Sequence, residues 1–381
     1  MDMSIAQDLS ADAYSARLVI DLDALADNYR RLAAEAAPAE TSAVVKADAY
    51  GVGADRVAPV LYSAGCRSFF VAHLQEAANL RPHLPRDATL YILNGLQPGA
   101  ETYAAANGFV PVLNSLEQVA AWRRAAGALH RDLPALLQFD TGMSRLGLSP
   151  EETARLLAEP DLLSGLSIRY IMSHLACADD SESPENDAQF AVMRERVAQF
   201  PGIPLCFANS GGIFFDKSFH GALVRPGVAL YGVTPSDRAA SPMKSVVRLE
   251  AKVIQTRIVP AGTKVGYSAS FIAPVEMELA TIAVGYADGL PRCLSNRGAA
   301  YFGATRLPIV GRVSMDSIII DVSALPQGTL TLGSLVEIIG AHQSLDDVAA
   351  DAGTIAYEIL TSLGHRYRRD YINNSKSGES A

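Results

Sequence analysis

The sequence predicts an α/β fold in which a closed (β/α)8 barrel of the TIM type is followed by a mainly β C-terminal domain. Eight strand-like runs alternate with helix-like segments between residues 43 and 225, and from residue 245 onward the chain consists mainly of alternating strands. Eight parallel strands that are joined by helices can close into a barrel. An open doubly wound sheet is the alternative that the same alternation allows.

An additional strand precedes the barrel strands. It lies at 18–22 and is followed by a helix at 23–35. Because the barrel already has eight strands without it, this first strand, near 17–22, is available to pair with the second domain. The β-branched residues Val44 and Val45 favour the first barrel strand. The eight barrel strands are expected at 43–46, 68–72, 89–93, 109–114, 136–140, 169–174, 205–209 and 222–225.

Two of the intervening helices have clear signals. Ser115 is a typical N-cap for a helix at 115–126. A second helix is expected at 186–200, because Phe190, Met193 and Val197 recur there at helical spacing.

The boundary between the two domains is expected near residue 240. Residues 234–242 contain two prolines and small polar side chains, which is typical of a linker. We therefore expect a barrel domain over 1–240 and a β-rich domain over 241–381 with a polar, frayed tail from 373. The second domain is expected to contain one long helix at 345–363 and strands at 248–259, 279–284, 307–310, 317–322 and 335–339.

The composition excludes several classes of protein. Apolar residues make up 49% of the chain, charged residues 19%, and the formal net charge is −9, so we expect no nucleic-acid partner. The four cysteines have no paired spacing, and no HExxH pattern occurs, so no metal is expected. No apolar run reaches the length of a signal peptide or a membrane span, which predicts a cytoplasmic protein without membrane contact.

Reactive side chains fall at the predicted strand ends, where the loops of a barrel surround its active site. Lys46 ends the first strand and opens a glycine-rich turn, so desolvation could neutralise its amine for Schiff-base formation with an aldehyde. An ordinary solvated lysine beside Asp48 is the alternative. Arg145 follows the fifth strand and His174 ends the sixth, where a packed core histidine is the alternative.

Small residues follow the seventh and eighth strands. The seventh leads into Asn209-Ser210-Gly211-Gly212 and the eighth into Arg225-Pro226-Gly227-Val228. Backbone amides in such turns can converge on a phosphate, and barrels often bind phosphate at this position. Simple turn formation is the alternative for each glycine taken alone. Together the two turns predict a phosphate site.

These segments resemble the motifs of alanine racemases over nearly the whole chain. The run from Val44 to Gly51 is similar to the lysine motif of that family, which binds pyridoxal 5'-phosphate (PLP). The other similar segments are Thr141–Gly147, Ser173–His174, Ala208–Ser210, Val224–Gly232, Val265–Tyr267, Val284–Gly289, Gly311–Asp316 and Tyr357–Glu358.

The resemblance implies a two-base racemisation of L-alanine and D-alanine that supplies D-alanine for peptidoglycan. Lys46 would bind PLP, and Tyr267 would be the second base. Racemisation removes a proton from one face of the α-carbon and returns one to the other, so the site needs an acid/base group on each side.

The resemblance also assigns the remaining site residues. Arg225 would contact the pyridine nitrogen of PLP and, since an arginine keeps its proton, would favour racemisation over transamination. His174 would bridge Arg225 and Tyr267. Arg145 would hold the phenolic oxygen of PLP and the substrate carboxylate. The remaining cofactor contacts would come from Tyr50, Asn209, Ser210, Gly227, Val228 and Tyr357.

A head-to-tail homodimer with shared active sites is implied as well. Met315, Asp316 and Tyr267 match residues that reach in from a neighbouring subunit, and Tyr286 matches a residue of the entry path. The alanine substrate would be contacted by Arg145, Met315, Asp316 and Tyr286.

The chain departs from the family in two segments. Some members carry a carbamylated lysine where this chain has Gln138, which shares a strand face with Leu136 and Asp140 and could point toward Arg145. We hypothesise that a bound anion such as chloride completes the site, and anomalous density near Gln138 would test this. The segment Tyr267–Phe271 also differs from the commoner version of that loop.

Three alternative functions stay open from the sequence. The first is a racemase for serine or a broader range of amino acids, although Tyr357 and Met315 would narrow the pocket. The second is a PLP-dependent decarboxylase with a barrel and a β domain, which Arg225 and Tyr267 disfavour. The third is a non-catalytic PLP-binding protein, and the presence of a whole second domain argues against it.

Overall fold

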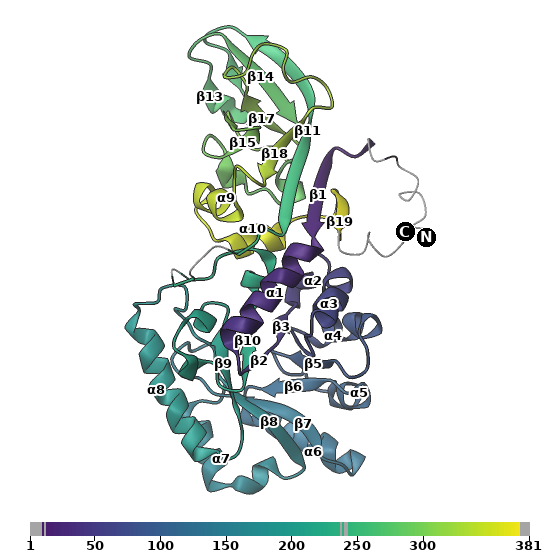
Figure 1. Cartoon of the computed structure of the whole chain (residues 1–381), viewed down its shortest axis with the longest axis vertical. Coiled ribbons are helices and arrows are strands. Elements are labelled where there is room, and N and C mark those ends of the chain that lie inside the picture. Colours follow the sequence, from purple (N-terminus) through teal and green to yellow (C-terminus); the bar gives the residue numbers. More distant parts are fainter. Residues whose placement is uncertain (1–9, 11–12, 237, 240–242, 374–381) are drawn as a thin grey trace. The chain divides into compact units, whose positions relative to one another are not determined.

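The computed structural model describes residues 10, 13–236, 238–239 and 243–373, which form two compact units. One unit is Leu25–Lys244. The other joins the described residues that precede Leu25 to those from Ser245 onward. Figure 1 shows the elements of both units, and each unit is described by itself below.

The unit Leu25–Lys244 is a nearly closed parallel barrel surrounded by helices (Figure 1), so the predicted barrel is confirmed and the open sheet is wrong. Its strand order is β2-β10-β9-β8-β7-β6-β5-β4-β3. The strands are β2 (Glu40–Thr41), β3 (Ala43–Val44), β4 (Ser68–Val71), β5 (Thr89–Ile92), β6 (Val110–Leu113), β7 (Leu133–Gln138), β8 (Leu166–Met172), β9 (Leu205–Asn209) and β10 (Leu223–Arg225).

The first barrel strand is split into the two short pieces β2 and β3, which are separated by Ser42 alone. The Ser42 amide donates to the Val224 carbonyl at 3.0 Å, and the Val44 amide donates to the Pro226 carbonyl at 2.9 Å. On the other side, the Val45 amide donates to the Phe70 carbonyl at 2.8 Å. The segment is therefore bonded to both of its neighbours in the ring.

Helices cover the outside of the barrel. The Ser115 hydroxyl accepts a hydrogen bond from the Gln118 amide at 3.3 Å, which confirms the predicted cap. The helix predicted at 186–200 is present as α8, in which Met193 is fully buried and Val197 is exposed. The helices are α1 (Leu22–Ala36), α3 (Ala54–Ser63), α4 (Leu74–Leu80), α5 (Glu101–Ala106), α6 (Leu116–Leu129), α7 (Pro150–Ala158) and α8 (Pro184–Gln199). The short element α2 (Lys46–Tyr50) is a left-handed turn.

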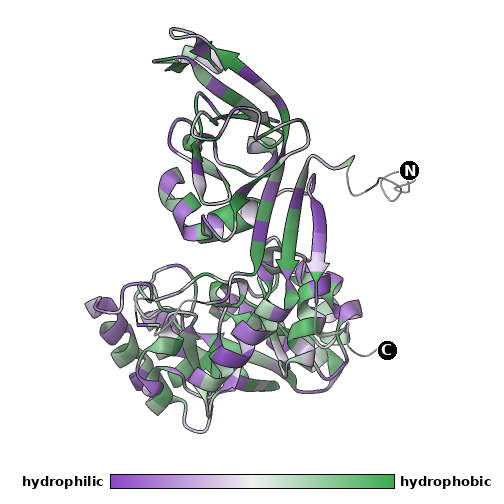
Figure 2. Cartoon of the chain, turned by 45° about the horizontal axis from the view of Figure 1, so that its top comes forward, coloured by the Kyte–Doolittle hydropathy of each residue, from purple (hydrophilic) through white to green (hydrophobic). Residues whose placement is uncertain are grey.

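The second unit is built on a mostly antiparallel sheet in which β1 (Ala16–Asp21) pairs with β11 (Val247–Val259) and with β19 (Arg368–Ile372). Along β11, buried and less buried positions alternate over much of its length. Figure 2 shows hydrophobic and hydrophilic residues in turn along the strands of this sheet. The other strands are β12 (Lys264–Val265), β13 (Phe271–Ile272), β14 (Met277–Ile282), β15 (Ala299–Phe302), β16 (Thr305–Pro308), β17 (Ile318–Asp321) and β18 (Leu335–Ile339).

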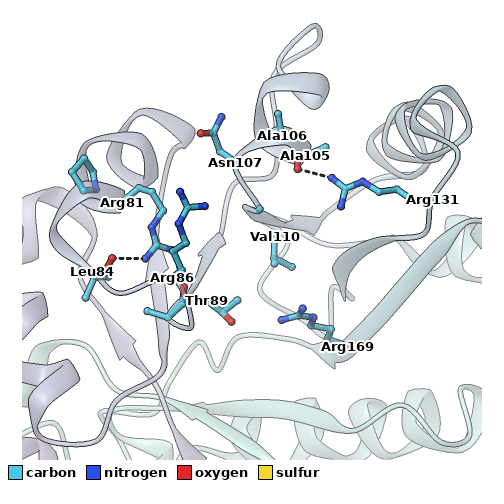
Figure 3. Close-up of a pocket in the computed structure, with 13 residues that line it drawn as sticks. Arg81, Leu84, Arg86, Thr89, Ala105, Ala106, Asn107, Val110, Arg131 and Arg169 are labelled. Atoms are coloured by element: carbon cyan, nitrogen blue, oxygen red, sulfur yellow. Dashed lines mark hydrogen bonds between the residues drawn. The ribbon is translucent and has the colours of Figure 1, made fainter.

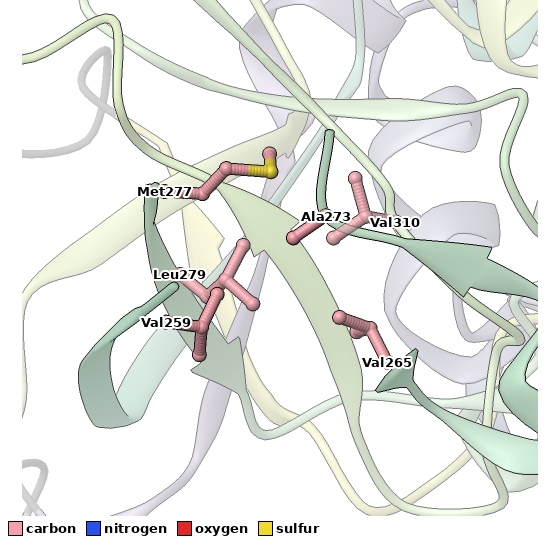
Figure 4. Close-up of a cluster of buried hydrophobic side chains, with 6 residues drawn as sticks. All are labelled: Val259, Val265, Ala273, Met277, Leu279 and Val310. Atoms are coloured by element: carbon pink, nitrogen blue, oxygen red, sulfur yellow. The ribbon is translucent and has the colours of Figure 1, made fainter. Parts of the chain in front are cut away.

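A small hydrophobic cluster stabilises the end of this unit that contains β14 (Figure 4). Its members come from several strands and loops that are distant in sequence, and all of them are buried. Burying apolar surface in this way is the main favourable contribution to folding of such a sheet. The cluster contains Val259, Val265, Ala273, Met277, Leu279 and Val310.

The long helix predicted at 345–363 is wrong. The structure has two helices instead, α9 (Leu345–Ala352) and α10 (Ala356–Ser362). Gly353 adopts a left-handed conformation with φ +70° and ends α9, which is a common way for a helix to terminate.

Short segments complete the described structure. Of the predicted linker, residues 237 and 240–242 lie outside the described residues, and the remainder contains no helix or strand. No helix among the described residues is both long and apolar enough to cross a membrane. The 3-10 turns are Arg81–His83, Pro160–Leu163, Gly212–Phe214, Lys217–Phe219, Val228–Tyr231, Tyr267–Ala269, Tyr286–Asp288 and Arg292–Leu294.

The cap of α6 provides a test of the barrel unit. We expect Ser115→Ala to lower the free energy of unfolding by about 1 kcal/mol, because the Gln118 amide loses its acceptor. Trp122 is the only tryptophan of the chain and is buried in the same helix, so its fluorescence in urea reports this change. Ser115→Asp retains a capping oxygen and should stay close to wild type. Equal stabilities for all three proteins would contradict the assignment.

Candidate active site

Lys46 begins a left-handed turn that follows the first barrel strand. The sequence predicts Lys46 as the last residue of the first barrel strand, and this detail is wrong. Strand β3 ends at Val44, so Lys46 lies two residues beyond the strand. The next four residues, Ala47 to Tyr50, all have φ between 52° and 55°. This conformation costs roughly 1–2 kcal/mol per residue for side chains other than glycine. Such strain is concentrated at functional sites, and the hydrophobic pattern did not indicate it.

Glu76 holds this turn in place. Its carboxylate accepts hydrogen bonds from the Ala47 amide at 2.6 Å, from the Ala72 amide at 2.6 Å and from the His73 amide at 3.0 Å. One side chain thus joins the turn after β3 to the loop after β4 and the start of α4. Sequence reasoning missed Glu76, and the only local signal is its position three residues after the helix N-cap.

The surroundings of Lys46 favour its neutral amine. Burial lowers the pKa of Lys46, and the positive charge of Arg145 lowers it further. The Glu76 carboxylate acts in the opposite direction and raises this pKa. A lysine with a lowered pKa can act as a nucleophile or as a base near neutral pH.

Arg225 is buried at the end of β10, and none of the described acidic residues is its partner. Its Nη1 donates to the Cys206 carbonyl at 2.8 Å, and its Nη2 donates to the Ser173 carbonyl at 2.7 Å. These carbonyls orient the guanidinium without neutralising it, and no carboxylate of the described residues forms an ion pair with it. A buried positive charge of this kind is suited to an electron-rich ligand.

His174 lies beside Arg225, two residues beyond the end of β8. The Nη2 of Arg225 and the Nδ1 of His174 are 3.5 Å apart. Because a guanidinium can only donate, Nδ1 must accept, which leaves the proton of a neutral ring on Nε2. Burial, followed by the charges of Arg225, Arg145 and Lys46, lowers the pKa of His174 to about 3. The ring is therefore neutral at physiological pH, with an Nε2–H donor.

The loop after β7 is folded by its own polar groups. The Asp140 Oδ1 accepts hydrogen bonds from the Gly142 and Ser144 amides, each at 3.0 Å. Arg145 follows and is exposed. The buried Gln138 amide donates to the Leu146 carbonyl at 3.3 Å, so it binds the backbone next to Arg145.

Gln189 is a second residue that sequence reasoning missed. This buried side chain of α8 donates to the Thr141 hydroxyl at 3.1 Å and to the His174 carbonyl at 2.9 Å. The Thr141 and Ser173 hydroxyls are 2.7 Å apart. Gln189 therefore joins the two loops that contain Arg145 and His174.

The turns after β9 and β10 come together as predicted for an anion-binding site. The Ser210 hydroxyl accepts hydrogen bonds from the Gly227 amide at 2.8 Å and from the Ala229 amide at 3.4 Å. A Cβ atom at Gly227 would lie only 2.4 Å from the Tyr50 hydroxyl, so no other residue fits there without displacement. Tyr50, Ser210, Gly227 and the adjoining Val228 are thus neighbours.

Asn209 has a bracing position in the same turn. Its Oδ1 accepts from the Gly212 amide at 3.1 Å, and its Nδ2 donates to the Leu175 carbonyl at 3.4 Å. Both ends of this side chain bind the backbone of neighbouring loops.

The remaining predicted site residues belong to the β-rich unit. Tyr267 is 69% exposed and Met315 is 52% exposed, and Tyr286 and Tyr357 are exposed as well. The Asp316 carboxylate accepts a hydrogen bond from the Arg366 Nη1 at 2.6 Å. Large apolar and aromatic side chains on a surface are typical of residues that contact a partner or a ligand.

The lowered pKa of His174 makes the barrel sensitive to acid. Between pH 6.5 and 3 the unfolded state binds a proton on this residue that the folded state does not, so stability falls as the pH falls. We expect wild type to lose about 2 kcal/mol more than His174→Gln between pH 7 and 5. Urea unfolding followed by Trp122 fluorescence measures this difference. His83→Gln, which removes an exposed histidine, should behave like wild type; equal losses in all three proteins would contradict the prediction.

Comparisons with known proteins agree with these features. A family model described as the alanine racemase N-terminal domain matches residues 20–235, and one described as the C-terminal domain matches residues 246–371. A catabolic alanine racemase of Agrobacterium fabrum is 59% identical over 381 residues, which cover 100% of this chain and 98% of that protein. An alanine racemase of Brucella canis is 55% identical over 393 residues, covering 100% of this chain and 99% of that protein.

Solved structures show the same relationship. The crystal structure of alanine racemase from Bartonella henselae with covalently bound pyridoxal phosphate has a TM-score of 0.91 and 47% sequence identity. The match covers 94% of this chain and 99% of that one. Both family models and the full-length relatives lead to one conclusion: the chain belongs to the alanine racemase family.

Proposed function

We propose that this chain is a PLP-dependent alanine racemase that interconverts L-alanine and D-alanine. The observation that carries the proposal is the arrangement of Lys46, Arg225 and His174 at the mouth of the barrel. Lys46 has a lowered pKa, and the buried Arg225, which has no acidic partner among the described residues, lies beside a neutral His174. Full-length relatives named alanine racemase support the same activity.

The residues of the barrel fit PLP. The Ser210 hydroxyl and the amides of Gly227 and Val228 would hold its phosphate, with the Tyr50 hydroxyl beside them. Asn209 braces this turn, and Tyr357 would add a contact from the β-rich domain. Bound PLP would withdraw electrons from the α-carbon of the substrate and so make its proton acidic. We therefore propose that the barrel domain is the PLP-binding domain.

Arg225 would face the pyridine nitrogen of the cofactor. A guanidinium donates but does not transfer its proton, so that nitrogen would stay largely unprotonated. The negative charge that develops on the substrate would then stay at the α-carbon, where a proton can return. This arrangement favours racemisation over transamination.

Two bases would move the proton. Lys46 would take or return it on one face of the α-carbon, and the Tyr267 oxygen would do so on the other face. For each turnover, one base accepts the proton of the substrate while the other releases a proton to the product. The Nε2–H of His174 would donate to the Tyr267 oxygen and hold it in position.

The substrate contacts in this proposal involve Arg145 of the barrel and residues of a second subunit. Arg145 would bind the carboxylate of alanine, while Met315, Asp316 and Tyr286 would border the substrate and its entry path. We propose that Met315, Asp316 and Tyr267 are supplied by a second subunit in a homodimer. Their exposure in the single chain supports this arrangement.

We further propose a cytoplasmic location and a supply of D-alanine for peptidoglycan. The four cysteines are all free thiols, and free thiols are typical of proteins in a reducing compartment.

Racemisation in deuterated water tests the proposed function. Purified protein with PLP should convert L-alanine into D-alanine with deuterium at the α-carbon. Lys46→Ala should abolish the visible absorbance of the bound cofactor and lower the rate of racemisation by about 10²-fold to 10⁴-fold. Tyr267→Phe should keep the absorbance, and its rate of racemisation should fall by a similar factor. Tyr103→Phe changes an exposed tyrosine of α5 and should leave the rate unchanged. Normal racemisation by Tyr267→Phe would refute the two-base assignment.

Glu76 provides a test of the lysine turn. Removing its charge in Glu76→Gln should lower the pKa of Lys46, because this carboxylate raises it. The rate at which PLP binds to the cofactor-free protein depends on the neutral amine, so its rise with pH should move to lower pH in the variant. Stopped-flow absorbance across pH 6 to 10 measures this profile. Glu195→Gln, an exposed residue of α8, is the matched control. If the rate of PLP binding changes in Glu76→Gln but its pH profile does not shift, the role of Glu76 is purely structural and the prediction is wrong.

A further inference from the structure

A basic cavity lies at the N-terminal ends of the barrel strands, opposite the strand ends that precede Lys46 and His174. Its volume is about 690 Å³. Thr89 is the first residue of β5, and Val110 is the first residue of β6. In barrel enzymes the reaction takes place at the other face, so this cavity is separate from the proposed active site.

Four arginines surround the cavity. Arg81 and Arg86 lie on one side, Arg131 lies across from them, and Arg169 projects from β8 (Figure 3). Among the described residues that line it there is no aspartate, no glutamate and no aromatic ring. Such a concentration of positive charge is notable in a chain whose formal net charge is −9, because the surface as a whole would repel anions.

The arginines are oriented but not neutralised. Arg81 donates to the Ala88 carbonyl at 2.9 Å and to the Leu84 carbonyl at 2.8 Å, and Arg131 donates to the Ala105 carbonyl at 2.8 Å. None of the four forms an ion pair with a carboxylate of the described residues. Burial and the charge of Arg86 lower the pKa of Arg81, while the carboxylate of Asp87, which does not line the cavity, has a smaller effect in the opposite direction.

Arg86 is the least engaged of the four. It is exposed, and within the described part of the chain it has no hydrogen bond and no ion pair. The neighbouring cavity, which shares Thr89 and Arg169 with this one, does contain the acidic residue Glu40, but the Ser68 hydroxyl donates to that carboxylate at 2.6 Å. Because Arg86 forms no such contacts within the described part of the chain, its full set of donors is available for a ligand.

We propose that this cavity binds the diphosphate group of a small molecule. The planar fork of a guanidinium matches two phosphate oxygens at once, and four such groups balance the charge of a diphosphate. Thr89 and Asn107 add a hydroxyl and an amide as further donors. Inorganic pyrophosphate and the phosphate chain of a nucleotide share this chemistry, and the absence of a lining aromatic ring favours recognition of the phosphates over a base.

Isothermal titration of the PLP-saturated protein with inorganic pyrophosphate tests this proposal. PLP occupies the proposed phosphate turn of the active site, so that site cannot account for the signal. We expect saturable binding, weakened about tenfold in Arg86→Gln, because one charge-assisted contact is lost. Arg86→Lys should fall between the two, since it keeps the charge but not the fork. Arg124→Gln removes an exposed arginine of α6 that does not line the cavity and should bind like wild type.

The outcomes separate the possible sources of the ligand. Tighter binding of ADP than of pyrophosphate would identify a nucleotide, and equal or weaker binding would identify the diphosphate alone. The proposal is overturned if wild type shows no saturable binding at millimolar pyrophosphate, or if Arg86→Gln matches wild type. An equal loss in Arg124→Gln would also overturn it, because the binding would then be general electrostatic attraction. The titration measures no turnover, so its result is independent of the proposed racemase activity.

Discussion

The closure of the barrel at its first strand is the constraint on which the rest of the site depends. The segment from Glu40 to Val45 bonds to the eighth strand on one side and to the second on the other. This closure brings two distant parts of the chain together, because the turn that contains Tyr50 then packs against Gly227. The lysine turn and the proposed phosphate turn are thereby built as one structure.

The barrel mouth collects positive charge with little compensation. Lys46, Arg145 and Arg225 all act on His174, and their charges and burial keep that ring neutral. Glu76 is the exception, but its carboxylate is used by three backbone amides and holds the left-handed turn. A site of this kind is completed by an anionic ligand, which agrees with the proposal that PLP binds there. The cost of assembling the cations is met by the packing of the closed barrel.

Several features could be predicted because they depend on neighbouring residues. Alternation of strands and helices, the Ser115 cap and the change of pattern after residue 240 are local signals, and the first two are confirmed. The single helix predicted at 345–363 is wrong, because Gly353 ends α9 in a left-handed conformation. This break depends on the backbone conformation of one residue.

The sequence by itself determined the class of fold, the order of the reactive residues and the family motifs that contain them. Those features depend on the spacing of residues along the chain, which can be determined without any knowledge of tertiary contacts. Only the tertiary structure decided that Lys46 leaves its strand through four left-handed residues and that Glu76 and Gln189 hold the loops together. It also decided that Arg225 has no acidic partner among the described residues and that four arginines meet around one cavity. These outcomes depend on which distant groups become neighbours, and hydrogen bonding and burial act only once the chain has closed.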